Sequence, residues 1–230
     1  MLRAYKYRIY PTDEQKVLFA KTFGCCRFVY NWALNLKIEA YRQEKRSVAY
    51  KEVQDRLVNE LKKENQWLAE VNSQALLNSI RNLDIAYKNF FRDTHAVEFP
   101  RFKSRKNRQS FQCPQHCSID FAKGTITIPK AKDIPAVLHR GFKGTVKTVT
   151  VSMTPSGRYF ASVLVDTAIQ EQKTSEPVHD TAIGIDLGIK SLAVCSDGRT
   201  FGNPKNLPGS LDRLKVLQKR LSRKRKGSSN

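Results

Sequence analysis

The stretch GIDLGIKSLAVCSDG (residues 184–198) contains the segment that decides the fold. Three apolar residues share one face of the strand it predicts, and we expect that face to belong to a core: Ile183, Ile185 and Leu187. Asp186 points the other way, and the glycines on either side leave the backbone open to a ligand. A carboxylate at the end of a buried strand suits a divalent cation that contacts phosphate oxygens. Asp186 is therefore predicted to be a metal ligand and a catalytic residue; the alternative is a turn-forming aspartate before a glycine.

The residues around this segment predict a short meander and a basic helix. Strands are expected over 182–187, 192–196 and 199–201, with Asp197-Gly198 as the hairpin turn. A helix is expected over 209–226, and the polar stretch 170–180 has no periodicity and predicts a linker. Two or three strands are marginal in water without a covering layer. Residues 181–230 are therefore expected to be the beginning of a fold rather than a complete domain.

Upstream, residues 12–92 predict a helical unit that follows a strand over 3–10. Pro11 ends that strand, and Thr12 with Gln15 has the spacing of a capping box. The first helix is expected to bury one face: Leu18, Thr22, Cys25, Val29, Trp32, Leu36 and Ala40. A second helix is predicted to pass through Val53, Leu57 and Leu61. A third, capped by Ser73, carries the apolar stripe Leu76, Ile80, Leu83, Tyr87 and Phe90.

The composition changes after FPRFKSRKNR (residues 99–108), where glycine, proline and β-branched residues replace the helical pattern. Alternating apolar residues predict that 109–167 is all-β. Cys113, His116 and Cys117, with Cys25 or Cys26, have the chemistry of a zinc site, although thiols in a loop explain the same spacing. The odd number of cysteines, five, and an N-terminus without a secretory signal pattern favour reduced thiols in the cytoplasm.

The charge of the chain is its broadest signal. The chain has 41 lysines and arginines but only 21 acidic residues, which gives a formal net charge of +20 over 230 residues. Such an excess makes a polyanion the expected partner, and no apolar run is long enough to span a bilayer. The predicted nucleic-acid-binding residues are Lys6, Arg27, Arg101, Lys103, Arg105, Lys106, Lys219, Arg220, Arg223, Lys224 and Arg225. Arg27 has a second interpretation, a structural ion pair within the helix.

Four stretches together resemble one family. GIDLGIKSLAVCSDG (184–198) is similar to the first RuvC-type segment of the TnpB or OrfB proteins of bacterial insertion sequences, which are RNA-guided DNA endonucleases related to type V CRISPR effectors. YRIYPT (7–12), GCCRFVYNWAL (24–34) and the pair LDIAYKNFF (83–91) with FPRFKSR (99–105) resemble the same family in the same order. The resemblance covers the whole chain, as the N-terminal part of such a protein.

The resemblance implies an α+β multidomain fold. Residues 1–11 and 93–170 correspond to a wedge-like β-barrel, 12–92 to an inserted helical recognition unit, and 181–230 to the incomplete start of an RNase H-like (RuvC) α/β domain. It also implies magnesium at the site of Asp186, guide RNA and target DNA as partners with no membrane or small-molecule substrate, and a cytoplasmic, nucleoid-associated location in a bacterium or archaeon. The family's second carboxylates, a Glu and another Asp, and its zinc ribbon have no counterpart after Asp186.

Two other functions fit parts of the sequence. A truncated or repurposed relative would bind RNA or DNA without cleaving it, as a regulator. An ATPase with a GIDLG phosphate loop would bind a nucleotide, but such proteins follow this motif with two threonines where Ile189 and Lys190 stand here. Of the three functions, we therefore expect that of an OrfB-type nucleic-acid-binding protein. We expect these residues by themselves to have no cleavage activity.

Overall fold

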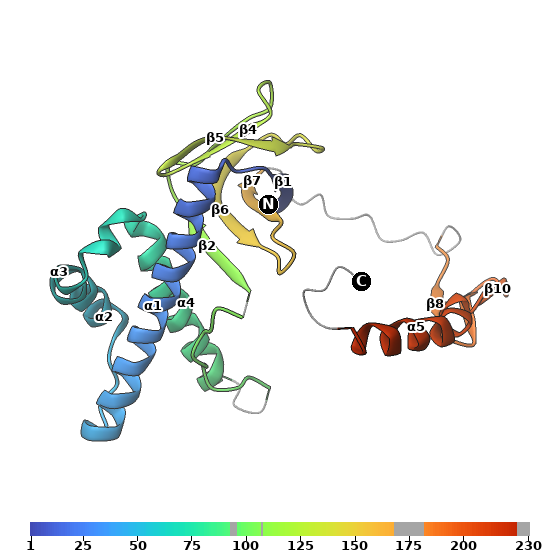
Figure 1. Cartoon of the computed structure of the whole chain (residues 1–230), viewed down its shortest axis with the longest axis horizontal. Helices are drawn as coiled ribbons and strands as arrows, with labels where there is room; N and C mark the ends of the chain where they lie inside the picture. Colours follow the sequence, from blue (N-terminus) through green and yellow to red (C-terminus); the bar gives the residue numbers. More distant parts are fainter. Residues whose placement is uncertain (93–95, 107, 168–181, 225–230) are drawn as a thin grey trace. The chain divides into compact units, whose positions relative to one another are not determined.

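The computed structural model describes residues 1–92, 96–106, 108–167 and 182–224 (Figure 1). The chain divides into two compact units, Met1–Glu171 and Gln172–Asn230. The linker predicted over 170–180 lies outside the described residues.

The first unit is built on an antiparallel seven-stranded sheet in the order β2-β6-β7-β1-β5-β4-β3. Its strands are β1 (Leu2–Ile9), β2 (Gln109–Cys113), β3 (Ser118–Asp120), β4 (Thr125–Ile128), β5 (Ala131–Val137), β6 (Thr145–Met153) and β7 (Tyr159–Asp166). The central strand β1 pairs along its whole length with β7, from Leu2 opposite Asp166 to Ile9 opposite Tyr159. The all-β prediction for 109–167 is thus confirmed.

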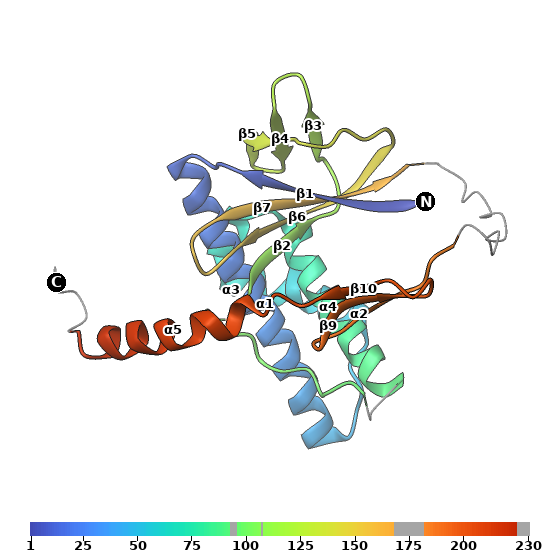
Figure 2. The same cartoon turned by 90° about the vertical axis from the view of Figure 1, so that its right-hand side faces the viewer.

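The sheet is open rather than closed into a barrel. Its edges are β2 and β3, and the described strands include no pairing between these two. Figure 2 shows β3, β4 and β5 at one end of the sheet and β2 beside the helices at the other. The mixed α and β content is confirmed, but the predicted barrel closure is not present in the described strands.

Helix α1 (Asp13–Glu44) begins as its sequence predicts. The Thr12 hydroxyl accepts a hydrogen bond from the Gln15 amide at 3.3 Å, and the Gln15 side chain accepts one from the Thr12 amide at 3.1 Å. The buried face differs from the predicted stripe, because the helix packs against both the sheet and α4. Residues buried on it are Phe19, Thr22, Phe23, Cys25, Cys26, Val29, Tyr30, Ala33 and Leu34. Four of the predicted residues are only half-buried: Leu18, Trp32, Leu36 and Ala40.

The remaining helices of the first unit are α2 (Tyr50–Arg56), the π-helix η1 (Leu57–Leu61), α3 (Lys62–Glu64), the 3₁₀ helix η2 (Gln66–Glu70) and α4 (Ser73–Arg92). All three apolar residues predicted for the second helix, Val53, Leu57 and Leu61, are buried. The predicted cap of α4 is wrong by one residue. Asn72 rather than Ser73 caps it, since the Asn72 Oδ1 accepts a hydrogen bond from the Gln74 amide at 3.0 Å.

The helices join the sheet through aromatic rings. Phe111 of β2 packs against Phe19 and Phe23 of α1, with ring centroids 5.6 and 5.3 Å apart. The sheet continues this apolar face with Val149, Val151, Ala161 and Val163, all buried. A single core therefore holds β1, α1, α4 and the strands from β2 to β7.

The second unit contains the strands β8 (Ile185–Leu187), β9 (Ser191–Cys195) and β10 (Thr200–Gly202), in the order β10-β9-β8, and helix α5 (Asn206–Ser222). The predicted turn is confirmed: Gly198 has φ 88°, and the Cys195 carbonyl accepts a hydrogen bond from the Gly198 amide at 3.0 Å. The predicted core face is wrong within the described residues, because Ile183, Ile185 and Leu187 are 50%, 62% and 74% exposed. Their expected covering layer is not among those residues.

No helix of the described residues combines the length and the apolar character needed to cross a bilayer.

The capping box at the start of α1 gives a direct test of local stability. Thr12→Ala removes the acceptor of the Gln15 amide, so we expect the free energy of unfolding to fall by about 1 kcal/mol. Urea denaturation followed by circular dichroism measures the change, and Thr12→Ser, which keeps the hydroxyl, serves as the control. Equal stability of the Ala and Ser variants would show that the hydroxyl does not hold this helix terminus.

Candidate nucleic-acid interface

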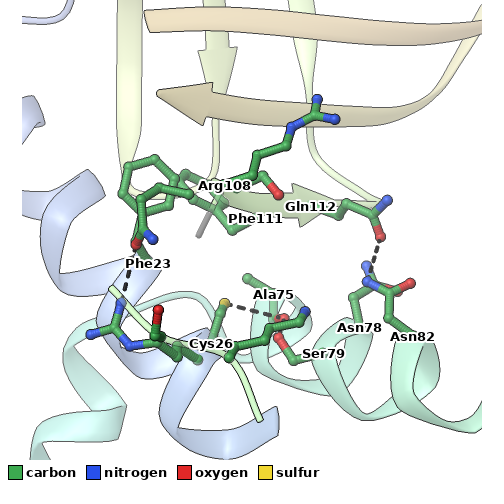
Figure 3. A pocket seen from close by; sticks show the side chains of 14 residues that line it. Phe23, Cys26, Ala75, Asn78, Ser79, Asn82, Arg108, Phe111 and Gln112 are labelled. Atoms are coloured by element: carbon green, nitrogen blue, oxygen red, sulfur yellow. Dashed lines mark hydrogen bonds between the residues drawn. The ribbon is translucent and has the colours of Figure 1, made fainter. Parts of the chain in front are cut away.

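A narrow cleft of about 90 Å³ lies between α1, α4, β2 and the segment 103–110 of the first unit. Figure 3 shows Asn78, Ser79 and Asn82 of α4 on one side and Phe111 and Gln112 of β2 on the other. We call this opening the amide cleft, because amide side chains from both sides line it. Two of the predicted nucleic-acid-binding residues, Arg27 and Lys103, also line it.

Arg27 reaches the cleft from α1 and is held by an amide rather than by a carboxylate. Its Nη1 donates a hydrogen bond to the Gln109 Oε1 at 3.1 Å, and the Gln109 Nε2 donates to the Arg105 carbonyl at 3.0 Å. An amide partner orients the guanidinium without neutralising it. Within the part of the chain that the structure describes, the interpretation of Arg27 as half of an ion pair is therefore not supported.

Lys103 is held through its backbone. The Asn31 side chain on α1 accepts from the Lys103 amide at 2.8 Å and donates to the Lys103 carbonyl at 2.9 Å. The Lys103 Nζ lies 3.9 Å from the centroid of the Tyr30 ring, a cation–π contact. Burial of this ammonium lowers the pKa of Lys103, partly offset by Cys26. Lys103 as a residue is exposed all the same, so its ammonium lies within reach of an anion.

The other basic residues of this loop are exposed as Lys103 is. Arg101 pairs with Glu98 at 2.7 Å, both side chains being more than three-quarters exposed, so this ion pair stabilises little. The Lys106 amide donates to the Ser104 hydroxyl at 3.2 Å, and Lys106 itself is exposed. Arg105 and Arg108 are likewise exposed. In Figure 3 the Arg108 guanidinium points away from Ser79 and Asn82.

The sequence pattern did not single out the amides of the cleft. The Asn82 Nδ2 donates to the Gln112 Oε1 at 3.3 Å, linking α4 to β2. Asn78 stands one helical turn before Asn82 and is half-buried beside it. The i, i+4 spacing of two asparagines next to the apolar stripe of α4 was the signal available in the sequence.

Cysteine chemistry does not contribute a metal site in the first unit. All five cysteines are free, and the described residues include no group of three His, Cys, Asp or Glu side chains that is able to hold a metal ion. The zinc interpretation of Cys113, His116 and Cys117 is therefore wrong within those residues. Cys26, in the amide cleft, donates to the Ala75 carbonyl at 3.5 Å, and burial raises the pKa of its thiol to about 11. It is a protonated core residue at neutral pH.

The remaining predicted residues lie elsewhere. Lys6 of β1 places its Nζ 4.6 Å from the Phe160 ring centroid, away from the amide cleft. Four basic residues of the second unit are exposed on α5 and just after it: Lys219, Arg220, Arg223 and Lys224. Arg225 lies outside the described residues.

Asp186 lies at the centre of β8, opposite Val194 of β9, and is exposed. The next acid along the chain, Asp197, binds the Arg199 guanidinium at 2.7 Å and lies in the hairpin turn. Among the described residues, no second and third ligand accompany Asp186. These residues do not by themselves fit a magnesium ion.

The geometry thus defines a mixed α/β fold with a cleft lined by amide and basic side chains. Family comparison agrees with the sequence resemblance. A family model of the OrfB proteins of IS605-type elements, described as a helix-turn-helix domain, matches residues 1–46. A second, described as a probable transposase, matches residues 162–230. In the structure, residues 1–46 form one strand and one continuous helix, β1 and α1.

Two relatives named for one activity align over nearly the whole chain. A protein named "Putative RNA-guided DNA endonuclease" from Streptomyces pristinaespiralis is 38% identical over 99% of this chain, and the InsQ protein of that name from Escherichia coli is 35% identical over 100%. The chain spans 56% of the length of each. The virulence protein VsdF of Salmonella dublin is 35% identical over 47% of this chain and 98% of its own length.

A solved structure, the cryo-EM complex of Cas12f1 with single guide RNA and target DNA, is 14% identical with a TM-score of 0.40. The alignment covers 96% of this chain and 61% of the Cas12f1 chain. On the family models and the relatives, the chain belongs to the OrfB family of insertion-sequence proteins.

The two hydrogen bonds of Asn31 are expected to control how the basic loop opens. Asn31→Ala removes both contacts to the Lys103 backbone, each worth about 0.5–1.5 kcal/mol, so trypsin should cleave after Lys103 and Arg105 about tenfold faster. Peptide mass mapping over time measures the rates. Asn35→Ala, one turn further along α1 on an exposed position, is the matched control. If both variants are cleaved like the native chain, the loop is held by other contacts.

Proposed function

We propose that this chain is the nucleic-acid-binding part of a transposon-associated, RNA-guided DNA endonuclease, and that its partners are a guide RNA and a target DNA. The observation that carries the proposal is the alignment, over nearly the entire chain, of relatives named for that activity. The amide cleft supports it, because it combines cations with hydrogen-bonding amides where a nucleic acid is able to reach them.

The domain organisation implied by the family is part of the same proposal. The open sheet with β1 at its centre would be the wedge-like domain, and the helices from α1 to α4 the recognition unit. The meander β8-β9-β10 with α5 would begin the RNase H-like domain. The insertion of α1–α4 between β1 and β2, and the division into two units near residue 171, support these boundaries.

The chemistry of the amide cleft suits two kinds of contact. Arg27 and Lys103 carry charge toward phosphate groups, and these contacts set position without reading sequence. Asn78 and Asn82 offer donor and acceptor pairs of the kind that recognise the edge of adenine. Since base pairing with a guide reads most of the target in such systems, the protein needs to read only duplex shape and a short flanking motif.

Salt-dependent RNA binding tests this function. We expect the chain to bind RNA, with affinity falling about 10³–10⁵-fold between 50 and 200 mM salt if about 6–10 phosphates are contacted. Lys103→Ala and Arg105→Ala should each reduce the slope of log Kd against log salt by about 1, whereas Lys63→Ala, at an exposed position of α3 outside the cleft and the basic loop, should not. Fluorescence anisotropy measures the slopes. No binding at low salt would contradict the proposed function.

Asp186 is proposed as one ligand of the family's magnesium site. The described residues do not complete such a site, so no catalytic step follows from Asp186 alone. Hydrolysis by two metal ions requires several carboxylates around ions about 3.5–4 Å apart, and one aspartate on an exposed strand does not meet that requirement.

We accordingly expect no magnesium-dependent DNA cleavage from this chain, with the native protein and Asp186→Asn equally inactive. Supercoiled plasmid incubated with guide RNA and Mg²⁺ reports nicking at high sensitivity. RNA binding by both proteins is the control that each is folded. Cleavage that Asp186→Asn abolishes would overturn the prediction, because other carboxylates of the chain would then have to complete the site.

A further inference from the structure

A second, larger cleft lies in the first unit and shares no residue with the amide cleft. It has a volume of about 1040 Å³ and is formed by the C-terminal halves of α1 and α4, the segment 45–49 and Phe99. Figures 1 and 2 both show the C-terminal ends of α1 and α4 beyond the sheet, where β3–β5 are far away. We call it the aromatic cleft.

The inner wall of this cleft is a packed set of aromatic rings. Tyr87 and Phe90 of α4 each meet Phe99 edge to face, at centroid distances of 5.4 and 5.5 Å. Burial, and then the nearby Tyr30, raise the pKa of Tyr87 to about 12, so its hydroxyl is uncharged at physiological pH. The wall therefore holds its shape before any ligand arrives, which lowers the entropy lost on binding.

Two rings stand out from that wall into solvent. Phe91 is 71% exposed and lies against Tyr87 at a centroid distance of 6.2 Å with an interplanar angle of 26°. Tyr41 of α1, on the other side of the cleft, is 61% exposed. Neither ring is part of the core, so each presents aromatic surface to a flat ligand.

Cations interleave with these rings. The Lys37 Nζ lies 5.3 Å from the Tyr87 centroid, and the Lys45 Nζ lies at the same distance from Tyr41. Lys37 is half-buried in the cleft, and this burial lowers its pKa. Six basic side chains line the cleft, Lys37, Arg42, Lys45, Arg46, Lys88 and Arg92, against one acid, Asp84, which Lys88 binds at 2.9 Å.

Not all six cations are available to a ligand. Arg42 pairs with Glu39 at 3.1 Å, and Arg46 pairs with Glu44 at 3.1 Å and bidentately with Glu52. The Arg46 pairs tie the end of α1 to α2, and the contact lowers the pKa of Glu52. The Lys37 Nζ donates a hydrogen bond to the Val48 carbonyl inside the cleft. Among the described residues, Lys45 and Arg92 are exposed and form no salt bridge with a carboxylate, and they supply the charge of the open side.

We propose that the aromatic cleft binds unpaired bases of single-stranded RNA, stacking them on Phe91 and Tyr41 with Lys45 and Arg92 near the phosphates. The inference rests on the proposed function and adds a specific site to it. Exposed rings flanked by unpaired cations are the arrangement that holds single strands, because every base has a flat face and every nucleotide a phosphate. An apolar protein helix would leave these cations without partners.

The chemistry of the aromatic cleft favours RNA over duplex DNA as its ligand. Recognition of folded RNA targets loops and ends whose bases are splayed out and stacked on aromatic side chains. A DNA target that enters as a duplex keeps its base faces stacked on one another, so the rings of Phe91 and Tyr41 would find no free face there.

The test uses the whole chain and an RNA strand of about ten nucleotides with 2-aminopurine near its middle, whose fluorescence is quenched by stacking. We expect Phe91→Ala and Tyr41→Ala each to weaken binding about 5- to 150-fold and to relieve the quenching. Phe91→Tyr should restore both. Tyr10→Ala, which removes an exposed aromatic outside the cleft, is the matched control.

A strand of the same length without bases separates stacking from charge. We expect it to bind the native chain more weakly than the RNA does and to be insensitive to Phe91→Ala. If RNA binds but neither cleft variant changes affinity or quenching, the aromatic cleft is not a base site, while the proposed function stands. If nothing binds, the proposed function itself fails. Tighter, Phe91-dependent binding of single-stranded DNA would overturn the assignment to RNA, and a change only in self-association would make the cleft a protein interface.

Discussion

The packing of Phe111 against Phe19 and Phe23 is the contact on which the first unit depends. It joins α1 to β2, two elements separated in sequence by the helices from α2 to α4, and so closes the core that contains both. Truncating a buried phenylalanine costs about 3–5 kcal/mol, whereas a hydrogen bond such as that between Arg27 and Gln109 contributes about 1. The aromatic contact therefore sets the position of α1, and the polar contacts beside it only refine that position.

Because Phe23, Arg27 and Asn31 follow one another at four-residue intervals, the aromatic contact also sets where the polar part of α1 faces. Arg27 reaches Gln109 and Asn31 reaches Lys103 as a consequence. The same helix then extends past the sheet, so that Lys37 and Tyr41 stand at a distance from any strand of the first unit. One helix of 32 residues thus supplies cations to two separate clefts.

Local patterns in the sequence predicted most of the elements. The capping box at Thr12, the apolar triplet Val53, Leu57 and Leu61, and the Asp197-Gly198 turn are decided by nearby residues, and each is confirmed. Contacts between distant segments could not be predicted in this way. Asn82 meets Gln112 and Asn31 holds Lys103 only because the tertiary fold brings them together, and the wide buried face of α1 depends on two partners that the sequence does not name. The exposure of Ile185 and Leu187 likewise depends on which other segments lie nearby.

The pairing of β1 with β7 has a consequence for how the first unit folds. Residues 2–9 form the centre of the sheet only when residues 159–166 are present. The two paired strands are therefore separated in sequence by nearly the whole unit. Such long sequence separations make folding slow, because closing the loop costs conformational entropy before the contact between the strands stabilises the chain. The helices from α1 to α4 rely on contacts much closer in sequence. During synthesis on the ribosome, an amphipathic helical segment would therefore form early and remain without its sheet, with Phe19 and Phe23 open to solvent, until the last strand emerges.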